Sequence, residues 1–153
     1  STAAVEEMGV RRAVVRTGLV LTIEGGIFPI WVLPFRLFLG ATLGSGDQRV
    51  AWIHMADEVG AIRFLIENQD AHGPFNLVAP NPATNAEFTQ KLAQVLHRPA
   101  LFRVPAFALR LALGEMSTLV LHGQRAIPHR LQELGFTFQF PELEPALRDL
   151  LEE

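Results

Sequence analysis

The sequence has no cysteine and no tyrosine, and Lys91 is the single lysine among its 13 basic residues. Without cysteine there are no disulfide bonds, no thiolate metal sites and no thiol nucleophile. Without tyrosine and with one ammonium group, the chain by itself cannot perform chemistry that needs a phenol or more than one lysine. These absences narrow the possible reactions before any motif is considered.

Long uncharged apolar runs are absent as well, since no stretch approaches the roughly 18–20 residues of a membrane span. Residues 1–10 lack a basic region followed by an apolar core, so we expect no secretory leader. The 13 basic and 16 acidic residues give a formal net charge of −3, which argues against a general binder of nucleic acids or of acidic membranes. We therefore expect a cytoplasmic protein with no nucleic-acid or membrane partner.

Residues 11–97 alternate short apolar runs with amphipathic segments. The run at 11–16 is β-branched without alternation, as in a strand covered on both faces, and a glycine-rich loop is expected over 17–30. Further strands are predicted over 50–55 and 75–78, and helices over 30–39, 57–68 and 84–97. This order predicts an α/β protein with at least some parallel pairing.

Two helix starts are predicted from their side chains. Asp57 is a good N-cap, and Thr84 with Glu87 fits a Thr-x-x-Glu capping box. The helix after Asp57 is expected to turn Val59, Ile62, Phe64, Leu65 and Ile66 inward or nearly so. The helix after Thr84 has the apolar stripe Phe88, Leu92, Val95 and Leu96.

Residues 98–153 have a different, mainly helical pattern. A short strand is predicted at 101–104, and a second strand at 136–140, where aromatic and polar residues alternate. Helices are predicted over 105–113, 115–122, 127–134 and 142–151, and Pro105 occupies the favoured first position of its helix.

Several familiar site motifs are missing. The glycines at 25–26 and 44–46 lack the spacing of a phosphate-binding loop, so they are better explained as turn residues. The five histidines show no metal-binding spacing, and no Gly-x-Ser-x-Gly element is present. The sequence therefore predicts no metal site and no serine nucleophile.

The segment Trp52–Asp57 is more informative, because it places polar and aromatic residues at the end of a predicted strand. Ligands of α/β proteins bind beyond strand ends, so Trp52 and His54 could line a pocket with Gln48 and Arg49 at its mouth. The alternative, weighted equally, is that Trp52 lies in the core and His54 caps a loop.

Three segments form a recognisable set: Val15–Leu21 (VRTGLVL), Gly44–Gln48 (GSGDQ) and Trp52–Asp57 (WIHMAD). Together they resemble motifs of the extended short-chain dehydrogenases/reductases. Six further segments are similar to the sugar-nucleotide-epimerase-like branch of that class, which carries a C-terminal domain of unknown function. These segments are residues 73–82, 84–89, 98–100, 104–111, 114–116 and 135–144. The resemblance covers nearly the whole chain but only the second half of such a protein.

The resemblance implies an α/β fold, namely the C-terminal part of a Rossmann-like extended short-chain dehydrogenase/reductase. Residues 1–97 would be the C-terminal portion of the region that binds NAD(P) and substrate, and residues 98–153 a mainly helical module. The parent would bind NAD or NADP, and this chain by itself is expected to bind none. A nucleotide-binding N-terminal half would be its missing partner.

The resemblance also implies site residues. Those matching the loop over the nicotinamide ring are Thr17, Gly18, Leu19 and Val20. Those matching the substrate side are Gly25, Gly26, Gln48, Arg49, Trp52 and His54. The Tyr-x-x-x-Lys pair that transfers a proton in this family is not in this chain, so we expect no catalytic residue here and no turnover from the chain alone.

One position departs from the family. Val50 stands where sugar-nucleotide epimerases usually carry an arginine that pairs with the diphosphate, and the neighbouring Arg49 would point to the opposite face of a strand. The first hypothesis is therefore the substrate-binding half of an NAD(P)-dependent oxidoreductase or epimerase-like protein acting on a small molecule. The alternative is an NAD(P)-binding sensor or scaffold with little catalysis.

A third hypothesis concerns self-association. The predicted strand at 11–16 would expose an unpaired edge if its neighbours were absent, and such an edge can pair with a second copy. This hypothesis predicts a homodimer or a rebuilt sheet.

Overall fold

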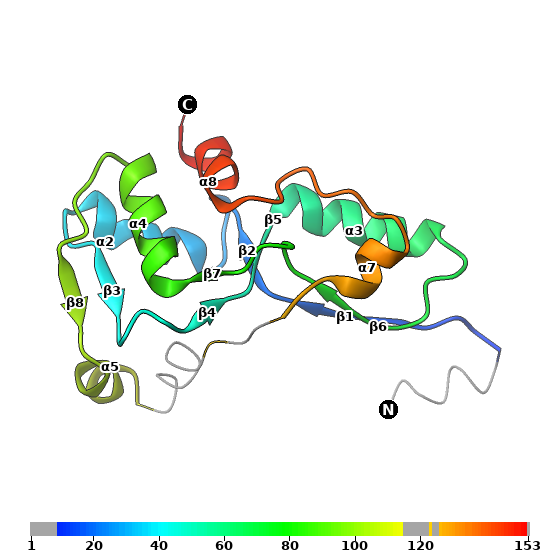
Figure 1. The fold of residues 1–153 in the computed structure, drawn as a ribbon, viewed down its shortest axis with the longest axis horizontal. Helices are drawn as coiled ribbons and strands as arrows, with labels where there is room; N and C mark the ends of the chain where they lie inside the picture. Colours follow the sequence, from blue (N-terminus) through cyan, green and yellow to red (C-terminus); the bar gives the residue numbers. More distant parts are fainter. Residues whose placement is uncertain (1–8, 115–122, 124–125, 153) are drawn as a thin grey trace.

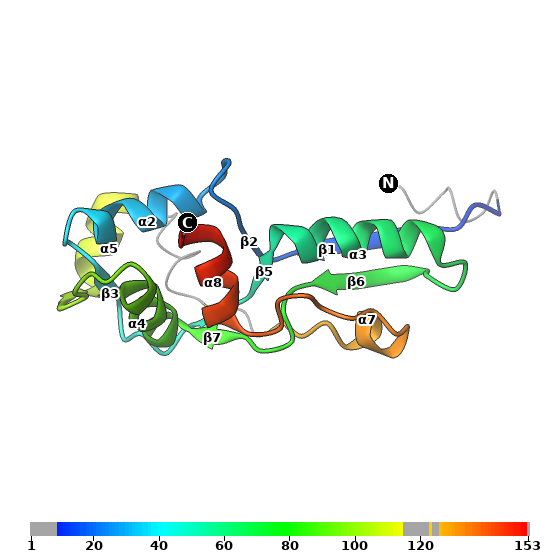
Figure 2. The same ribbon diagram turned by 90° about the horizontal axis from the view of Figure 1, so that it is seen from above.

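The computed structural model describes residues 9–114, 123 and 126–152, and it shows an elongated mixed α/β molecule (Figures 1 and 2). Strands β1 and β6 with helix α3 form one end. Helices α2, α4 and α5 with strands β3 and β8 form the other. Strands β2 and β5 lie between these two ends.

The first end is built on a parallel pair, β1 (Ala13–Thr17) and β6 (Gly73–Leu77). Helix α3 (Met55–Glu67) and helix α7 (His129–Glu133) pack there around a core that includes Phe75, Leu65 and Leu131. The sequence predicted this strand to be covered on both faces. Instead the second half of β1 is exposed, because among the described residues β6 is its hydrogen-bonded neighbour on one side only.

The middle of the molecule corrects the expected loop over 17–30. Leu19–Leu21 forms strand β2, which pairs in parallel with β5 (Trp52–His54). The strand predicted over 50–55 is split at Ala51, because β4 (Arg49–Val50) pairs with β7 (Ala83–Thr84) in the antiparallel sense. The chain therefore changes hydrogen-bonding partner within three residues.

The second end contains the larger core, which includes Phe28, Phe35, Phe88 and Leu92. The parallel strands β3 (Ala41–Leu43) and β8 (Phe102–Val104) lie beside three helices. These helices are α2 (Phe28–Arg36), α4 (Asn85–Val95) and α5 (Ala106–Leu113). The capping box predicted for α4 is present, since Thr84 Oγ1 accepts the Glu87 N–H and Glu87 Oε2 accepts the Thr84 N–H.

Two predictions about α3 were wrong. Its N-cap is His54, whose Nδ1 accepts the Ala56 N–H at 3.2 Å, and Asp57 lies inside the first turn. Leu65 is buried as expected, but Val59, Ile62 and Ile66 are exposed. The N-cap lies three residues earlier than predicted, and the buried residues of the helix are Asp57, Glu58, Ala61 and Leu65.

The last segment follows the prediction in its helices but not in its second strand. Helix α8 (Leu143–Leu151) packs against α4, and Lys91 Nζ lies 3.0 Å from Glu144 Oε2. Residues 136–140 are not a strand, because the N–H groups of Gln139 and Phe140 are bound by the Asp57 carboxylate and not by another strand. The helix predicted over 115–122 lies outside the described residues.

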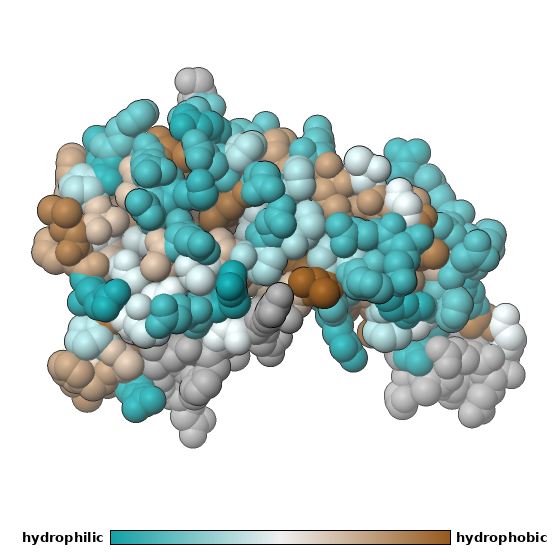
Figure 3. Space-filling view, in the orientation of Figure 1, coloured by the Kyte–Doolittle hydropathy of each residue, from teal (hydrophilic) through white to brown (hydrophobic). Residues whose placement is uncertain are grey.

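The division at residue 97 remains a prediction. Strand β8, from the second region, hydrogen-bonds to β3 of the first, and α8 packs on α4. In Figure 3 hydrophilic residues cover most of one face, and hydrophobic residues gather toward the end formed by β8 and α5. The exposed apolar residues of that end are Leu101, Phe102, Phe107 and Leu111.

Candidate functional site

A cavity of about 480 Å³ opens where β2 leaves Gly18 and α3 begins. Its walls include Gly18, Leu19 and Val20 from the predicted cofactor segment and Gly25 and Gly26 from the predicted substrate side. These two groups of residues are brought together in space although the family resemblance gave them different roles. Met55 and Glu58, from the first turn of α3, also line the cavity.

Gly18 has a structural reason to be glycine. A Cβ at this position would lie 2.5 Å from the Ala51 oxygen and 2.9 Å from Val78 Cγ1, closer than real contacts allow. The Gly18 N–H donates to the Leu77 oxygen at 3.1 Å, and the next N–H, of Leu19, donates to Ala51 at 2.7 Å. At Gly18 the strand that accepts the backbone hydrogen bonds therefore changes from β6 to the segment leading into β5. This change of partner lies at the edge of the cavity.

Glu58 is the residue that the sequence analysis missed. Its side chain is buried at 8% exposure, Oε1 accepts the Thr17 hydroxyl at 2.8 Å, and Oε2 is enclosed without a hydrogen-bond partner. Burial raises the pKa of Glu58, and the hydrogen bond from Thr17 lowers it by less. No local motif reveals this pair, because the two residues are 41 positions apart.

Thr17 does not line this cavity. It lines a neighbouring hollow of about 440 Å³ with Arg16, Asn76 and Val78. Gly18 is common to both spaces. The predicted cofactor residues therefore form one continuous edge at the end of β1, and Thr17 is tied across it to Glu58.

Trp52 and His54 are core residues. The Trp52 Nε1–H donates to the Asn81 oxygen at 3.3 Å, and the His54 ring stacks on Phe140 with 4.0 Å between ring centres. Burial lowers the pKa of His54, although the nearby carboxylates of Asp149 and Asp57 oppose this. His54 Nε2 lies 3.3 Å from Asp149 Oδ2 without hydrogen-bond alignment.

The alternative placed Trp52 in the core, which is confirmed, and expected His54 to cap a loop, whereas His54 caps helix α3. Neither residue lines the cavity at Gly18. A direct role for them in binding substrate stays a prediction.

Gln48 and Arg49 lie away from the cavity. The Gln48 side chain donates to the Leu43 oxygen at 2.8 Å, and Arg49 donates to the Pro82 oxygen at 3.2 Å. The Gln48 contact spans the turn that joins β3 to β4, and the Arg49 contact joins β4 to the segment just before β7. Their assignment to the substrate side likewise stays a prediction.

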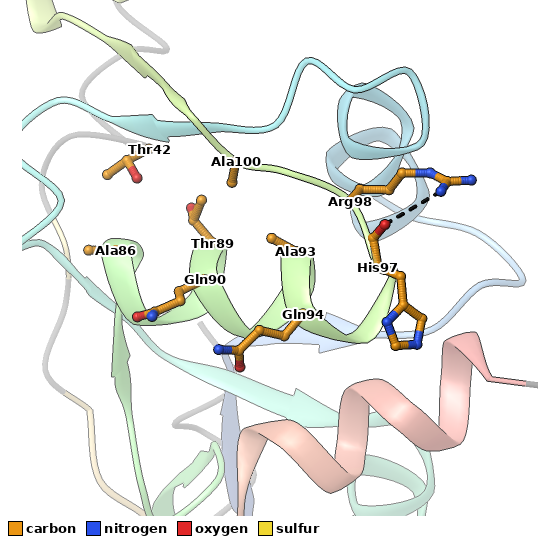
Figure 4. Close-up of a pocket in the computed structure, with 9 residues that line it drawn as sticks. All are labelled: Thr42, Ala86, Thr89, Gln90, Ala93, Gln94, His97, Arg98 and Ala100. Carbon is orange, nitrogen blue, oxygen red and sulfur yellow. Dashed lines mark hydrogen bonds between the residues drawn. The ribbon is translucent and has the colours of Figure 1, made fainter.

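A larger and shallower hollow of about 670 Å³ lies on one side of α4 (Figure 4). Gln90, Gln94, His97 and Arg98 are among its residues, and Arg98 donates weakly to the His97 oxygen at 3.4 Å. It contains none of the predicted site residues. Among residues 9–114, 123 and 126–152, no group of histidine, aspartate and glutamate has the arrangement of a metal site.

Comparison with known proteins agrees with the resemblance in the sequence. Residues 104–150 match a domain of unknown function, DUF1731. An epimerase family protein of Staphylococcus aureus (strain N315) is 44% identical over 148 residues, which is 97% of this chain and 49% of the relative. The chain thus spans about half the length of the curated relatives it matches.

Comparison with solved structures finds similar proteins. The human epimerase family protein SDR39U1 (isoform 2), crystallised with NADPH, has a TM-score of 0.89 and 40% identity over 94% of this chain and 49% of that protein. A nucleoside-diphosphate sugar epimerase from Corynebacterium glutamicum has a TM-score of 0.77 and 31% identity over 98% of this chain and 28% of that protein.

The fold is therefore that of the Rossmann-like extended short-chain dehydrogenases/reductases. Within that class, the chain is similar in sequence and structure to about half of an epimerase-family protein, and the DUF1731 match over residues 104–150 is consistent with a C-terminal part. In the part of the chain that the structure describes, no helix has both the length and the apolar character needed to cross a membrane.

Proposed function

We propose that this chain forms the nicotinamide-facing edge and the substrate side of an NAD(P)-dependent oxidoreductase or epimerase-like protein. The observation that carries the proposal is the shared cavity, where Gly18, Leu19 and Val20 meet Gly25 and Gly26. Its volume of about 480 Å³ lies within the usual range of small-molecule sites. The human relative was crystallised with NADPH, which supports the same cofactor class for this protein.

The residues at this edge fit a nicotinamide group. The cavity is lined here by Gly18, Gly25 and Gly26, which carry no side chain, and the enclosed Oε2 of Glu58 is an acceptor still without a donor. Thr17, Gly18, Leu19 and Val20 would hold the ring end of the cofactor. The cofactor would supply hydride transfer, while this chain would orient the ring and exclude water from one side.

The Tyr-x-x-x-Lys pair of the family is not in this chain, which has no tyrosine and whose one lysine, Lys91, is engaged by Glu144. We therefore infer that residues 1–153 alone do not turn over substrate, and that the catalytic pair would come from the other half of the parent. Hydride transfer catalysed by residues 1–153 alone would overturn this inference.

The exposed edge of β1 supports a position for that other half. Val15 is 44% exposed on β1, and Ile66 is 67% exposed on α3, which runs along the same strand pair (Figures 1 and 2). We assign this face to the N-terminal nucleotide-binding half, because the relatives are about twice as long as this chain. Light scattering tests the assignment: a homodimer that persists in the full-length protein through β1 would contradict it.

The cavity itself is tested by filling it. Gly25 has open space around its Cβ position and no left-handed backbone, so Gly25→Trp can enter the cavity without backbone strain. In a full-length protein carrying this chain, calorimetry with NADPH and NADH should show binding of one of them. Gly25→Trp should weaken that binding at least about tenfold, which corresponds to about 1.4 kcal/mol.

Gly25→Ala is the matched control and should stay within about twofold of the unaltered protein. Equal binding by the Trp and Ala variants would show that the cofactor does not use this cavity. Failure of the unaltered protein to bind either nucleotide would overturn the proposed function altogether.

A second candidate function is an NAD(P)-binding sensor or scaffold. The observation that favours it is Val50, which leaves the diphosphate-pairing position of sugar-nucleotide epimerases without a cation. The sequence of the other half discriminates between the two functions. A Tyr-x-x-x-Lys pair there supports the enzyme, while a retained glycine-rich turn without that pair supports the sensor.

A further inference from the structure

Glu58 has an arrangement that a purely structural carboxylate would not need. Buried carboxylate oxygens are normally paired, since an enclosed polar atom without a partner is costly. Here one oxygen accepts the Thr17 hydroxyl at 2.8 Å and the other is enclosed and unpaired. A leucine or methionine would fill the same space without this cost.

The contact sets the direction of the Thr17 hydroxyl. A hydroxyl has one proton to donate and two positions at which it accepts. Because the Thr17 proton is directed to Glu58 Oε1, the remaining capacity of Thr17 is that of an acceptor. Thr17 is itself exposed and lies directly before Gly18, at the edge assigned to the nicotinamide ring.

We infer that Glu58 is a positioning residue that holds the Thr17 hydroxyl as a hydrogen-bond acceptor for an uncharged N–H donor, such as the carboxamide –NH2 of a nicotinamide ring. The inference rests on the proposed function and adds a determinant of ligand chemistry to it. A ligand with a hydrogen-bond acceptor in place of the amide nitrogen would place that acceptor against the Thr17 oxygen, which is itself an acceptor. A ligand with a methyl group there would leave the contact unmade.

Alternative roles for Glu58 make different predictions. A structural role predicts that its loss weakens every ligand by the same factor. A positioning role predicts that its loss changes the ratio between two ligands that differ only at the donor. The ratio of affinities is therefore the informative quantity.

The experiment compares NADPH, or NADH if that is the cofactor bound, with its 3-acetylpyridine analogue, in which a methyl group replaces the amide nitrogen. Dissociation constants are measured by calorimetry on a full-length protein carrying this chain. The unaltered protein should bind the amide form about tenfold more tightly, as expected for one hydrogen bond.

Glu58→Gln keeps the volume but presents both a donor and an acceptor to Thr17, so the hydroxyl is no longer held in one direction. Its preference for the amide form should fall to within about twofold. Thr17→Val should also lose the preference, and Thr17→Ser should keep it. Glu67→Gln, on the same helix but exposed and paired with Arg63, is the matched control and should keep the tenfold ratio.

Each outcome decides the matter. An equal ratio in the unaltered protein and in Glu58→Gln overturns the positioning role, as does an equal weakening of both ligands. No binding of any nucleotide by the unaltered protein instead refutes the proposed function on which the inference rests. Melting temperatures of the variants, measured alongside, separate loss of fold from loss of preference.

Discussion

Asp57 holds the C-terminal segment to the start of α3, and its removal should be among the most damaging single changes. The carboxylate is 2% exposed and accepts two backbone N–H groups, from Gln139 at 2.7 Å and from Phe140 at 2.9 Å. Each hydrogen bond to a charged group contributes about 1.5–3 kcal/mol. Asp57→Ala leaves both N–H groups without this acceptor, so we expect a loss of about 3–5 kcal/mol in the free energy of unfolding.

Asp57→Asn tests how much of this free-energy loss comes from each of the two hydrogen bonds. Asparagine keeps one acceptor oxygen but presents an –NH2 group to the second N–H, so about half of the loss should remain. Urea unfolding gives the free energy, and hydrogen exchange should show faster exchange at the amides of Gln139 and Phe140. The control is Asp70→Asn, which is exposed. A loss below about 1 kcal/mol for Asp57→Ala, with unchanged exchange at these two amides, would refute the account of this contact.

Further predictions concern the helices and pH. Thr84→Ala removes the cap of α4 and should lower the free energy of unfolding by about 1 kcal/mol in urea. Gly60→Ala should raise it by about 0.5–1 kcal/mol, because the new Cβ would lie an ordinary 3.7 Å from Phe136 in a helix interior. Burial raises the pKa of Glu58 above its ordinary 4.5, so the neutral form of Glu58 contributes stability below pH 4.5, and this contribution is lost as the pH rises through the pKa of the folded state. Glu58→Gln should remove this pH dependence of the free energy of unfolding, measured in urea at several pH values. Burial lowers the pKa of His54 below its ordinary 6.5, so stability should fall as pH drops below 6.5, and His54→Asn, which keeps an N-cap acceptor, should flatten that part of the profile.

The features predicted correctly from the sequence are those whose causes are local. The capping box of α4 depends on Thr84 and Glu87, three residues apart, and both hydrogen bonds are present. The parallel pairing also followed from element order, and the helix beside Pro105 was predicted, although Pro105 is its N-cap and the helix begins at Ala106.

The features that were wrong or missed depend on distant partners. The alternating aromatics of 136–140 have a strand pattern, but the N–H groups of this segment bind Asp57, more than 80 positions away. The segment therefore stays extended without a neighbouring strand. Periodicity alone carries no information about such a partner.

The candidate site shows the same division between features with local causes and features that depend on distant residues. Gly18, Leu19 and Val20 were found through a motif, and the structure places them with Gly25 and Gly26 around one cavity. Glu58 was missed because its significance comes from Thr17, which lies on another element. For Trp52 and His54, the strand pattern could not tell a pocket wall from the core, and the structure shows them buried.

The central claim is that the nicotinamide end of a dinucleotide binds at the edge formed by Thr17 to Val20. A crystal structure of a full-length protein carrying this chain, with NADPH or NADH bound, tests it most directly. The account predicts the nicotinamide ring in van der Waals contact with Gly18 and Leu19, and its carboxamide nitrogen within hydrogen-bond distance of Thr17 Oγ1. A ring ordered elsewhere, for example in the hollow beside Gln94 and Arg98, would contradict it.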